Sequence, residues 1–188
     1  MVVNTLLPHL SVLVTVDDAA LEEYEDESTP ESERTVTRFI ESETEKTFAV
    51  LLKVDNDFAF VGNGLEIYVF VDGNLADALM VRQEDVVGSI QGYTCCSDGL
   101  HNAADEVRKY TFSNLQTVVS DASLHQEQAL VLRGLGCIRV EVSHCMTGDV
   151  AEFEAPESNV VGDEVSEKDT KGQQISNSVR CAKLDQLT

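Results

Sequence analysis

The feature that most constrains this chain is an alternation of apolar and polar residues with a period of two. Successive side chains of a β-strand point to opposite faces, so this alternation is typical of a strand with one buried face. Four segments show it clearly: Leu10–Val16, Phe48–Val54, Leu65–Val71 and Ile138–Val142. Weaker candidates are Thr35–Glu41, Ala76–Arg82, Arg108–Phe112 and Ala129–Leu132.

Turn residues separate these segments. Asn63-Gly64 precedes the third clear strand, Asp72-Gly73-Asn74 follows it, and Asp55-Asn56-Asp57 ends the second. Asn-Gly and Asp-Gly supply the positive φ angles that tight hairpin turns need. Short strands at this spacing predict an all-β fold, an antiparallel β-sandwich with a jelly-roll or immunoglobulin-like outline. The one helix we expect is a turn or two within Asp98–Glu106.

The chain divides into two parts by composition. Residues 1–145 hold the alternating segments and form the predicted sandwich domain, with an acidic loop at residues 22–33. Residues 146–188 lose the alternation and carry four basic against nine acidic residues, so we expect a polar, acidic tail. Within that tail, residues 174–181 are a candidate for a late strand.

Charge and cysteine content exclude several classes of protein. The 188 residues carry 34 acidic and 13 basic side chains, a formal net charge of −21. Nucleic acids and anionic membranes bind basic proteins, so neither is an expected partner. We find no apolar run long enough to span a membrane. The five cysteines are odd in number and show no C-x-x-C spacing. This favours reduced thiols and an intracellular, cytoplasmic or nuclear protein.

Enzymatic motifs are weak. Cys95 or Cys96 with His101 is the one nucleophile–base combination that a tight turn would bring together, but its flanking residues match no hydrolase signature. Serine-hydrolase and phosphate-binding motifs are missing. We therefore assign no catalytic residue and no cofactor, and we expect a protein that is not an enzyme.

Metal binding is the site class that the composition favours. Carboxylates at the strand ends of a sandwich supply the oxygen ligands that Ca²⁺ prefers. Turns also favour aspartate, and this preference alone is a simpler explanation for carboxylates at these positions. The candidate ligands of such a calcium-dependent binding or hydrolytic domain are Asp17, Asp18, Asp55, Asp57 and Asp72.

The acidic loop is the remaining candidate. Its carboxylates surround one tyrosine, and long-range attraction would draw a basic protein to them. The leading hypothesis is a non-enzymatic protein-interaction module, with an acidic, chaperone-like binder of basic proteins as an alternative. A purely solubilising loop accounts for the same charges. The candidate partner-binding residues are Glu22, Glu23, Tyr24, Glu25, Asp26 and Glu27.

The order of these segments resembles an uncharacterised fungal N-terminal domain family, a domain of unknown function. The resemblance implies a β-rich fold and a fungal source, and it implies no activity. It covers most of the chain and is carried by Leu10–Asp17, Leu21–Glu27, Thr35–Glu41, Phe48–Val54, Leu65–Gly73, Gly136–Val142 and Ser166–Ser176.

Overall fold

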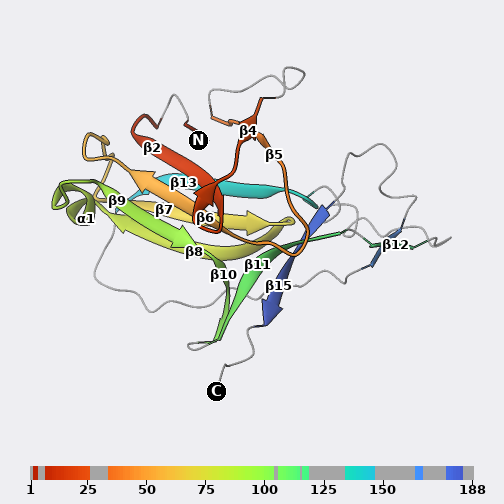
Figure 1. Cartoon of the computed structure of the whole chain (residues 1–188). Coiled ribbons are helices and arrows are strands. Elements are labelled where there is room, and N and C mark those ends of the chain that lie inside the picture. The colour runs from red at the N-terminus through yellow and green to blue at the C-terminus, as the bar shows by residue number, and fades with distance from the viewer. Residues whose placement is uncertain are drawn as a thin grey trace.

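The structure is a computed structural model of the chain (Figure 1). It describes residues 2–3, 7–25, 34–103, 106–114, 116–118, 134–146, 164–166 and 177–183. Among these residues, strands dominate and a single short helix is present.

The strands are β1 (Val2–Val3), β2 (Leu10–Val16), β3 (Ala19–Ala20), β4 (Glu23–Tyr24), β5 (Phe39–Ile40), β6 (Thr47–Val54), β7 (Gly64–Val71), β8 (Asn74–Arg82), β9 (Tyr93–Ser97), β10 (Gly99–Ala103), β11 (Glu106–Asn114), β12 (Gln116–Val118), β13 (Ile138–Cys145), β14 (Glu164–Ser166) and β15 (Asn177–Lys183). The helix is α1 (Gln83–Val87).

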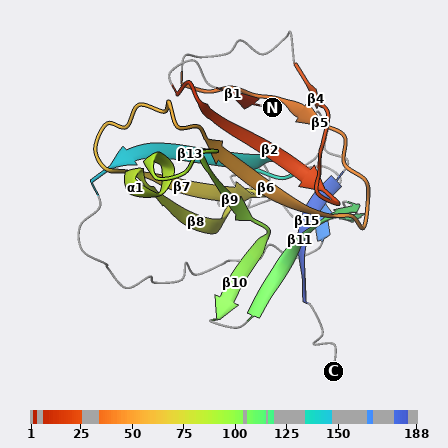
Figure 2. The same cartoon turned by 60° about the vertical axis from the view of Figure 1, so that its left-hand side comes forward.

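The larger sheet is built around β6. Its strands follow the order β1-β2-β6-β11-β10, with β3 beside β2, β9 beside β6 and β15 beside β11, and every pairing is antiparallel. One edge of β6 pairs with β2, and the other pairs first with β11 and then with β9. The pair β10–β11 therefore leads away from the rest of the sheet, as Figure 2 shows.

The second sheet has three antiparallel strands in the order β13-β7-β8. Asp72 and Gly73 connect β7 to β8 with φ angles of 50° and 80°. Positive φ at both central residues belongs to the tight turn that suits the twist of a hairpin, and an Asp-Gly pair accommodates it. The register of β7 and β8 shifts at Val69 and Phe70, which marks a β-bulge.

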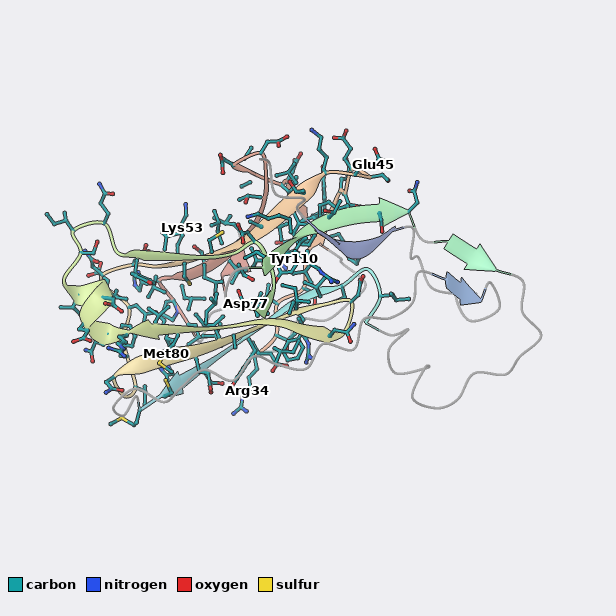
Figure 3. All side chains as sticks on the ribbon, turned by 90° about the horizontal axis from the view of Figure 1, so that it is seen from below. Arg34, Glu45, Lys53, Asp77, Met80 and Tyr110 are labelled. Carbon is teal, nitrogen blue, oxygen red and sulfur yellow. The ribbon has the colours of Figure 1, made fainter. Side chains whose placement is uncertain are left out.

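One hydrophobic core joins residues of both sheets. On β6 every second side chain is buried, as the alternation predicts, and β7 behaves in the same way. Figure 3 shows the strands of the two sheets at two levels, with Tyr110 and Asp77 between them. The buried apolar residues of the cluster are Leu10, Phe48, Val50, Leu52, Val54, Phe58, Leu65, Ile67, Val69, Val71, Ala76, Val81, Val86, Leu100, Tyr110 and Phe112.

The prediction of an all-β protein with antiparallel sheets is confirmed, and all four clear segments form strands. The helix expected within Asp98–Glu106 is wrong, because most of this segment forms β10, which pairs with β11. The jelly-roll or immunoglobulin-like outline stays a prediction. Segment Ala129–Leu132 lies outside the described residues.

Three weaker strand candidates differ in extent from the strands observed. Of the candidate Thr35–Glu41, only Phe39–Ile40 is a strand, whereas Ala76–Arg82 and Arg108–Phe112 lie within the longer strands β8 and β11. In the tail, β15 overlaps residues 174–181 and pairs with β11 along seven residues. The boundary between a sandwich domain and a tail at residue 145 stays a prediction.

Candidate partner-binding surface

The start of the predicted acidic loop is held against the larger sheet. After β2, Asp17 and Asp18 form a turn with φ angles of 50° and 63°, and β3 returns along β2. The amide of Leu21 then donates a hydrogen bond to the carbonyl of Val14 at 2.8 Å. This contact fixes the direction in which the chain enters β4.

Strand β4 pairs with β5, which brings two aromatic residues together. Tyr24 lies directly opposite Phe39, and Glu23 lies opposite Ile40. Directly opposed residues of a strand pair share one face. Ile40 packs against the core, whereas Tyr24 and Phe39 are 41% and 54% exposed. Figures 1 and 2 both place β4 and β5 at the periphery of the molecule, beyond β2.

Carboxylates flank the aromatic pair. The Tyr24 hydroxyl donates a hydrogen bond to Oε2 of Glu22 at 3.1 Å. This bond raises the pKa of Tyr24, and partial desolvation and the charges of Glu22 and Glu41 raise it further, so the phenol stays protonated. Nη2 of Arg38 lies 3.2 Å from Oε1 of Glu25. We call Glu22, Tyr24, Glu25, Phe39 and Glu41 the Tyr24–Phe39 surface.

The structure describes four of the six predicted partner-binding residues. Glu22, Glu23, Tyr24 and Glu25 lie on or beside β4, while Asp26 and Glu27 lie outside the described residues. Phe39 and Glu41 were missed by the sequence reasoning. Phe39 stood within a weak strand candidate, but its pairing with Tyr24 has no signal in the sequence.

The candidate calcium ligands do not converge. Strands β2 and β6 run antiparallel, so Asp17 and Asp18 lie at one end of this pair and Asp55 and Asp57 lie at the other. The Nζ of Lys46 lies 3.1 Å from Oδ2 of Asp17, so this carboxylate already forms an ion pair with a lysine. Within the described part of the chain, no three His, Cys, Asp or Glu side chains group closely enough to hold a metal ion.

The fifth candidate ligand has a structural partner. Asp72 is buried, and its Oδ1 accepts a hydrogen bond from the amide of Gly136 at 2.6 Å. Its own amide donates to the carbonyl of Cys137 at 3.0 Å. Asp72 thereby fastens the β7–β8 turn to the segment that leads into β13.

The cysteine candidates have environments that oppose nucleophilic chemistry. Burial raises the pKa of Cys95 to about 11, and burial and the charge of Asp98 raise the pKa of Cys96. A reactive cysteine needs a lowered pKa, because the thiolate is the nucleophile. The two side chains also point to opposite faces of β9, with Cys95 half-buried and Cys96 exposed. The side chain of His101 lies outside the described residues.

These observations define an antiparallel β-rich protein with an exposed acidic and aromatic surface. The sequence profile of a family described as Domain of unknown function (DUF7918) matches residues 9–187, and the chain belongs to this family. The resemblance to an uncharacterised domain family is thereby confirmed, while the fungal source stays an implication. Comparison with curated proteins found no match, and neither did comparison with solved structures.

No helix in the described ranges is long and apolar enough to cross a membrane.

Proposed function

We propose that this domain is a non-enzymatic interaction module, a β-sandwich that binds a basic segment of a partner protein through the Tyr24–Phe39 surface. The observation that carries the proposal is the pair of opposed, exposed aromatic rings on an acidic strand pair. Aromatic residues are enriched among the residues that dominate binding energy at protein interfaces.

The chemistry of the surface favours a cationic partner. A Lys or Arg side chain placed over an exposed ring gains about 0.5–1 kcal/mol from the ring quadrupole. Glu22 and Glu41 both lie close enough to act on the Tyr24 phenol, so they would also act on a cation at the ring. Charge attraction speeds the encounter, and the rings restrict where the cation settles.

The strand pair gives the surface a fixed geometry. Ile40 and Leu21 pack against the core, and the Leu21 amide is hydrogen-bonded to β2, so the backbone beneath the rings is anchored. An anchored surface loses less entropy on binding than a mobile loop does. The thiols of Cys95, Cys96, Cys137 and Cys145 are free, which supports an intracellular location for this module.

Binding of a synthetic Lys- and Arg-rich peptide, measured by fluorescence anisotropy over a range of salt concentrations, tests the proposal. Replacing either ring, by Tyr24→Ala or Phe39→Ala, is expected to weaken binding by about two- to fivefold and to leave the salt dependence unchanged. Tyr24→Phe keeps the ring and is expected to bind like the parent. Glu22→Gln with Glu41→Gln is expected to weaken binding and to flatten its salt dependence.

The matched control removes the same number of charges elsewhere. Asp57 and Asp85 are exposed carboxylates after β6 and on α1, so Asp57→Asn with Asp85→Asn changes the net charge equally. If this control weakens binding as much as the Glu22 and Glu41 changes do, or if neither ring variant has an effect, the attraction is diffuse and the proposal is wrong.

A further inference from the structure

Strand β13 forms an edge of the smaller sheet. It pairs with β7 along all eight residues without a register shift, and no other described strand pairs with it. The opposite edge, β8, carries a bulge, which is a device that protects sheet edges from pairing. A long, regular edge without such a device is a template for another strand.

The two faces of β13 differ. Ile138, Val140 and Val142 face the core and stay half-buried, whereas the residues of β7 that face the core are fully or almost fully buried. Arg139 and Glu141 lie on the outer face. Among the described residues, no further strand lies beside β13 to cover the outer edge of this apolar row.

The charges of β13 are balanced. In a chain with a net charge of −21, this strand carries one Arg, one Glu and one His. Arg139 stacks over the Phe70 ring, with its Cζ 4.0 Å from the ring centroid, and forms an ion pair with Glu141. At physiological salt the Debye length is about 8 Å, so distant negative charges do little to keep two such strands apart.

The sequence of β13 is complementary to itself in one antiparallel register. For the core-facing side chains of both copies to lie on one face of the joined sheet, one residue must lie directly opposite its own copy, with the two-fold axis midway between the two. An axis at Arg139 or at Glu141 sets like charges opposite each other. An axis at Val142 sets Glu141 opposite Ser143.

An axis at Val140 sets Arg139 opposite Glu141 twice and Ile138 opposite Val142 twice. This register pairs opposite charges on the outer face and apolar residues on the core face. Opposite charges and branched apolar side chains are favourable cross-strand pairs, and like charges directly opposite are unfavourable.

We propose that two copies of this chain associate through β13, in an antiparallel pairing centred on Val140 that joins their smaller sheets into one continuous sheet. The partner is a second copy, because pairing β13 with itself in this register places each Arg139 opposite a Glu141. The surface involved is separate from the Tyr24–Phe39 surface, so either proposal can fail without the other.

Sedimentation equilibrium of the full chain, over a wide range of concentrations, measures the association. The parent chain is expected to show a concentration-dependent dimer. Arg139→Glu and Glu141→Arg each set like charges opposite each other at both pairs, and each is expected to weaken self-association by about tenfold or more. Asp85→Arg makes the same charge change as Glu141→Arg on α1 and is expected to dimerise like the parent.

An equimolar mixture of the two single variants separates this pairing from a role within one chain. The Arg139→Glu chain has acidic residues at positions 139 and 141, and the Glu141→Arg chain has basic residues at both. In a mixed dimer each acidic residue lies opposite a basic one, so the mixture is expected to recover the dimer. Thermal melting of each variant confirms that it is folded. A parent chain that stays monomeric, a dimer that both charge variants retain, or a mixture that does not associate would each overturn the proposal.

Discussion

The hydroxyl groups of Ser97 and Tyr110 lie 3.0 Å apart in the interior, where both side chains are almost fully enclosed. Ser97 ends β9 and Tyr110 lies in β11, two strands that share one edge of β6. Their hydrogen bond therefore joins the two strands at the point where β6 changes partner. Tyr110 also stacks on Phe48 of β6, with ring centroids 5.3 Å apart.

This pair is expected to stabilise the fold cooperatively. Ser97→Ala and Tyr110→Phe each remove one partner of this buried hydrogen bond, and each is expected to cost about 1–3 kcal/mol of unfolding free energy. The double variant is expected to lose less than the sum of the two, because both single substitutions remove the same hydrogen bond. Urea denaturation of the four proteins measures the coupling, and strictly additive losses would contradict it.

A second pair of substitutions tests the two faces of β6. Leu52 has no exposed surface, whereas its neighbour Leu51 points to the other face and is partly exposed. Leu52→Ala is expected to lower the free energy of unfolding by about 2–5 kcal/mol, because it removes buried methyl groups and leaves a cavity. Leu51→Ala makes the same chemical change and is expected to cost clearly less. Equal losses would mean that both faces of this strand are buried.

A third expectation concerns the turn that Asp72 fastens. Asp72→Ala removes the acceptor of the Gly136 amide and places alanine at a φ of 50°, so a loss of about 1–3 kcal/mol is expected. Asp72→Asn keeps an acceptor oxygen, and asparagine tolerates positive φ, so its loss is expected to be smaller. Denaturant unfolding ranks the two variants, and the reverse order would contradict this role.

Gly134 offers an independent test of the same contact. A Cβ at Gly134 would lie 2.5 Å from the Cα of Gly73, so the two backbones meet too closely for any side chain. Gly134→Ala is expected to destabilise the protein more than Gly88→Ala, where the nearest atom is the Glu84 carbonyl oxygen at 3.1 Å. If the two variants unfold alike, the turn and the segment before β13 are not held together.

The strands that could be predicted from the sequence are those whose own residues carry the pattern. Leu52 and Val69 belong to strands in which fully buried residues alternate with less buried ones, as the sequence period predicts. Within Asp98–Glu106 a helix of a turn or two was expected. Most of this segment forms β10 because β11, which follows it in the chain, supplies a partner strand.

The candidate site was predictable in part for a related reason. Glu22 and Tyr24 attract notice as an acidic segment around an aromatic residue. Strands of two residues are too short to show a period, so nothing in the sequence pairs Tyr24 with Phe39. The separation of Asp17 from Asp55 depends on the antiparallel pairing of β2 with β6, which the sequence left open.

Calcium is expected to leave the stability unchanged. Asp17 and Asp55 lie at opposite ends of a strand pair, and Asp72 already accepts a backbone hydrogen bond. A ligand bound only by the folded state adds about 2.7 kcal/mol at a hundred times its dissociation constant, which a thermal melt detects readily. Melting with millimolar Ca²⁺, with Mg²⁺ as the comparison, is expected to give no shift, and a rise specific to Ca²⁺ would restore the calcium hypothesis.

The half-buried thiol of Cys95 makes the stability of the protein depend on pH in the alkaline range. Burial raises its pKa from 9.0 to about 11, so the folded state favours the protonated thiol. The resulting contribution to stability is fully present below pH 9.0 and is lost as the pH rises toward 11. Cys95→Ser removes the titrating group, so the difference in unfolding free energy between parent and variant is expected to change across this range. Denaturant unfolding at a series of pH values measures that difference, and a constant difference would mean that the thiol titrates normally in the folded protein.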